Sequence, residues 1–329
     1  MTYLPTVAAA RPAGVTNHTA IYSEANAPAS LPRAPTLADA IATGYGTLDL
    51  RLDVETRTFW NWMRPPGRPN FSAALLSDIA SVQASIRRSF EGCTRPEEHP
   101  LRYYVLASRV NGIFNLGGDL GHFADRIRAG DRASLLRYGR MCIEAVHGNA
   151  IAFGTPAITI ALVQGDALGG GFECALAFDL IIAERRARFG LPEILFNLFP
   201  GMGAYSFLSR RIGPVRAEQM IMSGKLYTAA ELHEMGIVDV LAEDGEGEHA
   251  VREYIARHGR IHNAHRAIYE TRRRVNPVTL DELQSVVEVW VDAALNLGQQ
   301  DLRKMIRLAT AQDRRMAGMA PPAHAVAAE

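Results

Sequence analysis

The stretch from Ile158 to Gly203 constrains the fold of this chain more than any other. It opens with an apolar, largely β-branched run at 158–163, which predicts a strand buried on both faces. The glycine run from Gly169 to Gly171 follows and leads into FECALAFDL, whose apolar residues recur at helical spacing. The glycines therefore mark a strand-to-helix junction. Backbone N–H groups at a helix start lack intrahelical partners and can bind an oxygen that gains negative charge.

Two glutamates accompany this junction. Glu173 lies in the first turn of the predicted helix, and Glu193 opens the next one in LPEI, after a short strand around Phe189. Taken alone, each is explained as a helix-start residue that the helix dipole favours. A second glycine-rich strand exit, Gly117-Gly118 in NGIFNLGGDLGHF, offers another place where main-chain amides can face a ligand. Two such exits with two glutamates fit one acyl site better than two unrelated turns.

These segments resemble the crotonase (enoyl-CoA hydratase/isomerase) superfamily, through GIFNLGGDL, GDALGGGFECALAFDLIIAE, ARFGLPEI and FPGMGA in order and spacing. The resemblance implies an α/β fold, with a crotonase-like ββα spiral core and a C-terminal all-helical region. It implies an acyl thioester whose carbonyl oxygen lies between the backbone amides of Gly118 and Gly170, with Glu173 and Glu193 as catalytic carboxylates. On the same basis, we expect the remaining substrate-binding residues to be Gly117, Leu168, Gly169, Gly171, Phe196, Gly201 and Met202.

One branch of the superfamily is closer than the rest. FNLGGDLGHF, GFECALA, EILFNLFPGMGAYSFLSR and EVWVDAALNLGQQDLRKMIRLATAQDRR resemble the bacterial diffusible-signal-factor synthases. This implies dehydration of a 3-hydroxyacyl-acyl-carrier-protein to a cis-2-enoyl thioester, and its hydrolysis to a free unsaturated fatty acid that serves as a quorum-sensing signal. No cofactor is expected apart from the carrier, acyl carrier protein or coenzyme A. The alternative is an enoyl-CoA hydratase or isomerase of fatty acid metabolism, which releases no free acid.

The chemistry follows from the residue types. Dehydration needs one carboxyl to handle the proton at C2 and another to serve the oxygen at C3. The sequence leaves open which glutamate has which role, although burial among Phe172, Phe189 and Phe196 would raise either pKa. A nucleophile elbow G-x-S-x-G does not occur, and Cys174 in an apolar helix is typical of a packed hydrophobe. Cys174 also stands where the dinucleotide pattern G-x-G-x-x-G requires glycine, which disfavours an oxidoreductase.

Composition excludes several other classes. The 35 basic residues balance the 35 acidic ones, which disfavours nucleic acid or an anionic membrane as partner. The 3 cysteines have no metal-ligand spacing and predict a reducing, cytoplasmic setting without a bound metal. No apolar run approaches the ~18 residues of a membrane helix.

Three regions are expected along the chain. Residues 1–40, rich in Ala, Pro, Ser and Thr, predict a flexible tail, with a partner-binding arm as the alternative. Residues 41–245 form the spiral core, in which we expect the following elements: a hairpin turning near Glu55, a helix at 72–90, strands at 103–108 and 237–241, and a helix at 135–152. Residues 246–329 form the helical region, which in crotonase relatives covers the active site or contacts a neighbouring subunit.

Partner predictions complete this reading. The resemblance implies a homotrimer or hexamer, and restraint by a regulatory protein is a further hypothesis that no residue identifies.

Trp60 and Trp62 share one face of a strand and favour core or interface packing over ligand contact. The run Arg272 to Arg274 is either a solvated helix face or a contact for phosphates or an acidic carrier surface. No role is assigned to His122.

Overall fold

We describe residues 36–319 of a computed structural model, with side chains for residues 36–313. Residues 1–35 of the predicted tail lie outside the described residues. Helix α1 (Leu37–Thr43) begins before residue 41, where the core was expected to start. Thr36 and Asp39 form a reciprocal capping box at its N-terminus, and Leu37 and Ala40 are buried. The ordered fold therefore includes part of the segment that composition assigned to the tail.

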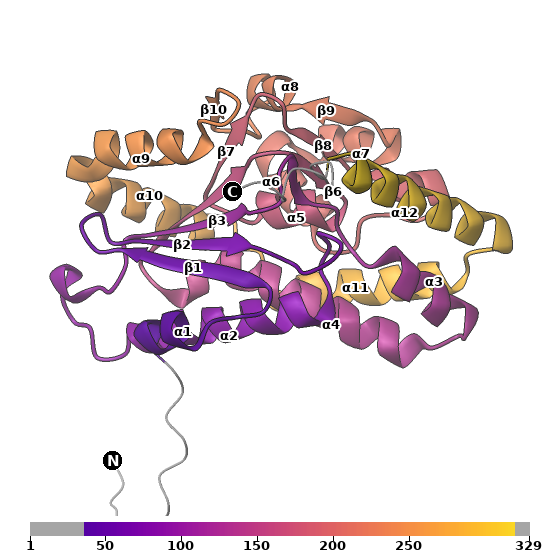
Figure 1. Ribbon diagram of the computed structural model, residues 1–329, viewed down its shortest axis with the longest axis horizontal. Coiled ribbons are helices and arrows are strands. Elements are labelled where there is room, and N and C mark those ends of the chain that lie inside the picture. The colour runs from indigo at the N-terminus through magenta and orange to yellow at the C-terminus, as the bar shows by residue number, and fades with distance from the viewer. Residues whose placement is uncertain (1–35, 320–329) are drawn as a thin grey trace, which may run out of the picture. The chain divides into compact units, whose positions relative to one another are not determined.

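A six-stranded sheet forms the centre of the fold (Figure 1). Its strands follow the order β1-β2-β3-β5-β7-β10, with β1 and β2 antiparallel and the other pairs parallel. They are β1 (Leu48–Asp53), β2 (Thr58–Met63), β3 (Tyr103–Ser108), β5 (Ile158–Val163), β7 (Leu180–Glu184) and β10 (Val240–Ala242). The predicted hairpin and the strands at 103–108 and 158–163 are confirmed. The strand expected at 237–241 is wrong in its bounds, because only 240–242 pair with β7.

A second sheet of four short strands, in the order β4-β6-β8-β9, lies beside the first. Its members are β4 (Ile113–Asn115), β6 (Asp166–Leu168), β8 (Arg188–Gly190) and β9 (Leu226–Thr228). Each of β4, β6 and β8 follows a long strand, β3, β5 or β7, and precedes a helical segment. This repeated ββα unit confirms the spiral core, and it brings the exits of β4 and β6 together because the two strands are parallel neighbours.

Helices cover both faces of the large sheet (Figure 1). Helices α2 (Ala73–Ser89) and α4 (Arg132–Ala150) belong to the larger apolar core. On the other face, α9 (Gly247–His258) and α10 (His262–Val275) close over a smaller cluster that contains Trp60 and Trp62. These indole rings stack with centroids 5.3 Å apart, which confirms core packing. Helix α4 starts earlier than the predicted residue 135, because Asp131 caps it by accepting from Ser134 N at 3.0 Å.

The remaining helices surround the glycine loops. They are α3 (Leu120–Arg128), α5 (Gly170–Leu176), α6 (Ala204–Ile212), α7 (Pro214–Ser223), α8 (Ala229–Glu234), α11 (Leu280–Leu295) and α12 (Gln299–Met319). The C-terminal helices predicted from residue 246 onward are confirmed, but α11 packs along α4, and α12 packs on α3. They are therefore part of the same body as the spiral core. Among the helices described, none is long and apolar enough to cross a membrane.

Candidate active site

The loops that follow β4 and β6 touch through their backbones. A Cβ atom on Gly117 would lie 2.8 Å from Leu168 O and 2.9 Å from Gly170 N. A Cβ atom on Gly171 would lie 2.1 Å from Asn115 O. No side chain fits between the loops at these points. These glycines, together with Leu168, are not in the cavity wall, and they act by holding the two loops in contact.

Gly118 and Gly170 line a cavity beside this loop contact. Gly170 is the first residue of α5, where an amide N–H has no partner within the helix. In the part of the chain that the structure describes, neither amide donates a hydrogen bond to a protein acceptor. Two unpaired N–H groups on adjoining loops can bind one oxygen, as expected for an oxyanion hole.

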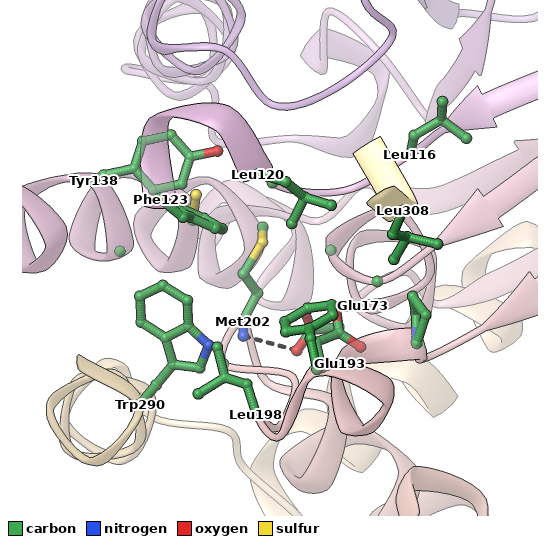
Figure 2. Close-up of a pocket in the computed structure, with 18 of the residues that line it drawn as sticks. Leu116, Leu120, Phe123, Tyr138, Glu173, Glu193, Leu198, Met202, Trp290 and Leu308 are labelled. Carbon is green, nitrogen blue, oxygen red and sulfur yellow. Dashed lines mark hydrogen bonds between the residues drawn. The ribbon is translucent and has the colours of Figure 1, made fainter. Parts of the chain in front are cut away.

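Glu173 lies on α5 and is only 1% exposed. Its Oε1 accepts hydrogen bonds from Met202 N at 2.7 Å and Ala204 N at 3.0 Å. These donors belong to the loop FPGMGA and the start of α6, and Gly203 between them has a φ of 112°. The loop thus fixes the carboxyl of Glu173 by main-chain bonds (Figure 2).

Glu193 lies on the 3₁₀ helix Pro192–Phe196, a single short turn instead of the longer helix expected there. Asn197 in the left-handed conformation, with a φ of 63°, ends this turn. The Oε1 atom of Glu193 lies 2.5 Å from the position that a Cβ on Gly169 would take, so the carboxyl rests on the glycine run. Its Oε2 is buried and has no hydrogen-bond partner among the described residues. That oxygen is available to a ligand.

The two carboxyls influence each other. Burial raises the pKa of Glu173 to about 7, and the N–H groups of Met202 and Ala204 oppose this rise. Burial also raises the pKa of Glu193 to about 8, helped by the negative charge of Glu173. Because both pKa values are raised to near or above neutrality, either carboxyl can accept or donate a proton near neutral pH.

The cavity above the pair has a volume of about 630 Å³ and a largely apolar wall (Figure 2). Of the residues predicted to bind substrate, Gly169, Phe196, Gly201 and Met202 line it together with both glutamates. The sequence did not identify the other residues of the wall. These are Leu116, Leu120, Phe123, Tyr138, Gly139, Cys142, Pro192, Leu198, Val287, Trp290, Leu308 and Gln312.

Helix α11 packs closely against two glycines of the cavity wall, Gly201 and Gly139. A Cβ on Gly201 would lie 2.5 Å from the ring of Trp290, and one on Gly139 would lie 2.6 Å from Val287 Cγ1. In the sequence, Leu283, Val287, Trp290, Ala294 and Leu297 recur at helical spacing, which predicts an apolar stripe on this helix but not the residues that it covers.

Other candidate groups are placed elsewhere. His122 is absent from the cavity wall, and its ring packs on Tyr138 with centroids 5.7 Å apart. Cys174 is buried, and burial raises the pKa of its thiol to about 12, so it remains a neutral packed group at neutral pH. Over residues 36–313, no cluster of three or more His, Cys, Asp or Glu side chains is arranged to hold a metal ion.

The arginine run at the end of α10 is neither fully solvated nor free. Arg272 and Arg273 pair with Asp179, which is 2% exposed, and Arg274 pairs with Glu270 on its own helix. Arg272 and Arg273 thus fasten α10 to the residue that precedes β7.

Known proteins are similar to this chain in sequence. The family model "Enoyl-CoA hydratase/isomerase" matches residues 84–301. A 2,3-dehydroadipyl-CoA hydratase of Escherichia coli is 31% identical over 210 residues, which cover 63% of this chain and 72% of that protein. The human mitochondrial enoyl-CoA hydratase domain-containing protein 2 is 31% identical over 188 residues, which cover 57% of this chain and 59% of that protein.

Solved structures show the same fold. An enoyl-CoA hydratase of Bacillus halodurans superposes with a TM-score of 0.67 at 21% identity, covering 80% of this chain and 99% of that one. DspI of Pseudomonas aeruginosa superposes with a TM-score of 0.57 at 25% identity, covering 70% of this chain and 89% of that one. With the spiral core, the adjoining glycine loops and a family match over most of its length, this chain belongs to the enoyl-CoA hydratase/isomerase family of the crotonase superfamily.

Proposed function

We propose that this protein is a crotonase-type lyase that dehydrates a 3-hydroxyacyl thioester. The observation that carries the proposal is that the buried carboxyls of Glu173 and Glu193, both with a raised pKa, line one largely apolar cavity with the amides of Gly118 and Gly170, which have no protein acceptor among the described residues. The apolar wall suits an acyl chain, and the polar groups would lie where a thioester carbonyl binds.

The amides of Gly118 and Gly170 would bind the thioester oxygen. Charge that develops there as the C2 proton leaves is stabilised by these fixed donors, each worth about 3 kcal/mol. The ionised carboxyl of the pair takes the C2 proton, and the protonated one donates its proton to the departing C3 hydroxyl. The C2–H and C3–O bonds break, the C2=C3 bond forms, and water leaves. The proton is then on the other carboxyl, and its transfer back, directly or through water, restores the resting state.

We further propose that the substrate is carried by acyl carrier protein and that the same site hydrolyses the product thioester to a cis-2-unsaturated fatty acid signal. The segments that resemble diffusible-signal-factor synthases support this, and the likeness to DspI adds to it. The carboxyl pair is the base available for activating water near the carbonyl. Hydration or isomerisation of coenzyme A esters is the second candidate, favoured by the likeness to the E. coli hydratase.

Assembly and location are also proposals. We expect a homotrimer or hexamer, as in crotonase relatives, and a reducing compartment such as the cytoplasm. The three cysteines, Cys93, Cys142 and Cys174, are free thiols in the structure, which agrees with a reducing setting.

The test supplies purified protein with medium-chain 3-hydroxyacyl groups on acyl carrier protein and, separately, on coenzyme A. Enoyl products and free acid are measured by mass spectrometry, and free thiol by a colorimetric assay. Enoyl thioester and free acid from the carrier-protein substrate support the full proposal. Enoyl-CoA interconversion without free acid would move the protein to the hydratase class, and no turnover of either thioester would refute the lyase assignment.

A further inference from the structure

A second cavity, of about 690 Å³, lies at the far ends of the helices that build the catalytic site. Helix α5 carries Glu173 near its start, and its last residue, Leu176, lines the second cavity. Helix α6 donates Ala204 N to Glu173 and presents Phe207 to the second cavity. The two cavities share no wall residue, so the second one is a separate site.

Four arginines line this second cavity: Arg210, Arg211, Arg272 and Arg273. Asp179 accepts from both Arg272, at 3.0 Å, and Arg273. The single carboxylate of Asp179 thus pairs with two guanidinium groups. Asp179 is also bound by Thr159 N at 2.9 Å, so its oxygens are already shared among several donors.

The other two arginines have one acidic partner each. Arg210 is paired with Glu282 at 2.8 Å. Arg211 reaches Asp239 only at 3.9 Å and donates mainly to backbone carbonyls, such as Phe178 O at 2.7 Å. Burial lowers the pKa of Arg211, and the charge of Asp239 opposes this. Four guanidinium groups therefore pair with three carboxylates, so among the described residues this cluster carries one more positive than negative charge.

Two donors in the wall are also unsatisfied. The Nε atoms of Arg210 and Arg273 are buried and have no hydrogen-bond partner among the described residues. A buried donor without a partner is unfavourable, and more so when it is charged. These Nε atoms are covered by protein, so the deficit that a ligand in the cavity would remove is the surplus positive charge.

The rest of the wall is mostly apolar. It consists of Ala150, Ile151, Leu176, Ala177, Phe178, Phe207, Pro277 and Val278, with Asn276 as the one further polar residue. Such a wall would accept a hydrocarbon tail and would give an inorganic anion nothing to pack against. The apolar wall and the surplus positive charge together favour a ligand with a hydrocarbon chain and one negative charge.

We propose that this arginine-lined cavity is a binding site for an amphipathic monoanion, a medium-chain alkyl carboxylate. Its carboxylate would pair with the arginines, and its chain would lie against the apolar wall. The free acid released by the proposed thioester hydrolysis is one such molecule, but the binding site itself does not depend on that reaction.

Two measurements on the full-length protein test the proposal. Decanoate binding is followed by isothermal titration calorimetry, and a decanoate analogue bearing a diazirine at its chain end is photolysed on the protein and mapped by peptide mass spectrometry. We expect labelling in the segments 150–151, 176–178 and 276–278. Labelling confined to the catalytic cavity, around 139–142 and 287–290, would overturn the proposal.

Arg272→Gln removes the surplus charge, while Asp179 keeps Arg273 as its partner. We expect it to weaken decanoate binding and labelling at this cavity about 10-fold, because one charge-assisted hydrogen bond is lost. The matched control is Arg274→Gln, two residues away, which is paired with Glu270 outside the cavity and should bind like the wild type. Equal binding by Arg272→Gln and wild type would refute the site.

A second pair of variants tests the cavity without touching its charges. Val278→Trp should fill the apolar part and abolish labelling there, and Val278→Ala should retain it. Labelling that survives Val278→Trp would count against the site. Neither assay uses a thioester, so a failure here leaves the proposed lyase standing, and a protein without lyase activity would still bind decanoate.

Discussion

The floor and the roof of the catalytic cavity are built by different means. The floor consists of two glycine loops in backbone contact and the carboxyls of Glu173 and Glu193, the first of them held by two backbone amides. The roof consists of side chains on α11 and α12, such as Trp290 and Leu308. A side chain added where the glycine loops touch must move backbone, whereas a change in the roof alters the space left for an acyl chain. Reaction chemistry should thus be sensitive to the floor and chain selectivity to the roof.

The largest effect is expected from the carboxyl pair in the floor. Glu173→Gln and Glu193→Gln should each lower kcat by about 10²–10⁴, because each removes one partner in proton transfer. Turnover of the accepted 3-hydroxyacyl thioester measures this. Glu234→Gln, an exposed glutamate on α8, is the matched control. Retained activity in both variants would refute the proposed role of the two carboxyls.

The next effect concerns the backbone donors. A Cβ on Gly170 would lie 2.5 Å from Met202 Sδ and 3.4 Å from Gly117 Cα, so either Met202, whose N–H binds the Glu173 carboxyl, or the contact between the glycine loops must shift. We expect Gly170→Ala to lower kcat about 10²-fold with a smaller change in KM. Gly67→Ala is the control, because a Cβ there meets nothing within 4 Å. A rise in KM alone would show that Gly170 serves binding and not the transition state.

The raised pKa of Glu193 in the floor should also make the free energy of unfolding depend on pH. The pKa of Glu193 is raised from an ordinary 4.5 to about 8, so folding favours its protonated form. That contribution is complete below pH 4.5 and is lost as the pH rises through about 8. Between about pH 5 and pH 8, the free energy of unfolding should fall by on the order of 2 kcal/mol more in wild type than in Glu193→Gln. Urea titrations at several pH values measure this, and parallel curves would contradict the buried, uncharged state.

The smallest effect is expected in the roof. Gly139→Ala places a methyl group against Val287, so α11 or the Val287 side chain must shift, and this changes the shape of the cavity that both residues line. We expect kcat/KM to fall about 10-fold for the longest accepted chain and little for short ones, since a methylene is worth about 1–3 kcal/mol in a fitted pocket. The double variant with Val287→Ala should restore the long chain. An equal loss of kcat/KM at all chain lengths would show that the roof also positions the reacting groups.

Local patterns predicted the floor well. The strand at 158–163, the glycine run and both glutamates lie within one short stretch, and the structure brings Gly118 beside them because β4 and β6 are parallel neighbours. The sequence did not show that the carboxyl of Glu173 would bind Met202 N, because that bond depends on the path of a loop 29 residues away. The catalytic roles of these residues stay predictions.

The roof could not be predicted residue by residue. The stripe on α11 indicated burial, but its contact with α4 joins segments about 150 residues apart and depends on tertiary packing. The run Arg272–Arg274 is a similar case: its charge was evident, but its partner Asp179 is remote in sequence. Small strands such as β9 and the early start of α4 were missed because a three-residue bridge or a single cap leaves a weak pattern.

The backbone contact between the two glycine loops has an evolutionary consequence. Neither loop can gain a side chain at Gly117 or Gly171 unless the other retreats, so the two must be inherited together. The helices of the roof come from a later, contiguous part of the chain and meet the floor through replaceable side chains. Replacing the last two helices would therefore leave this backbone contact between the glycine loops unchanged.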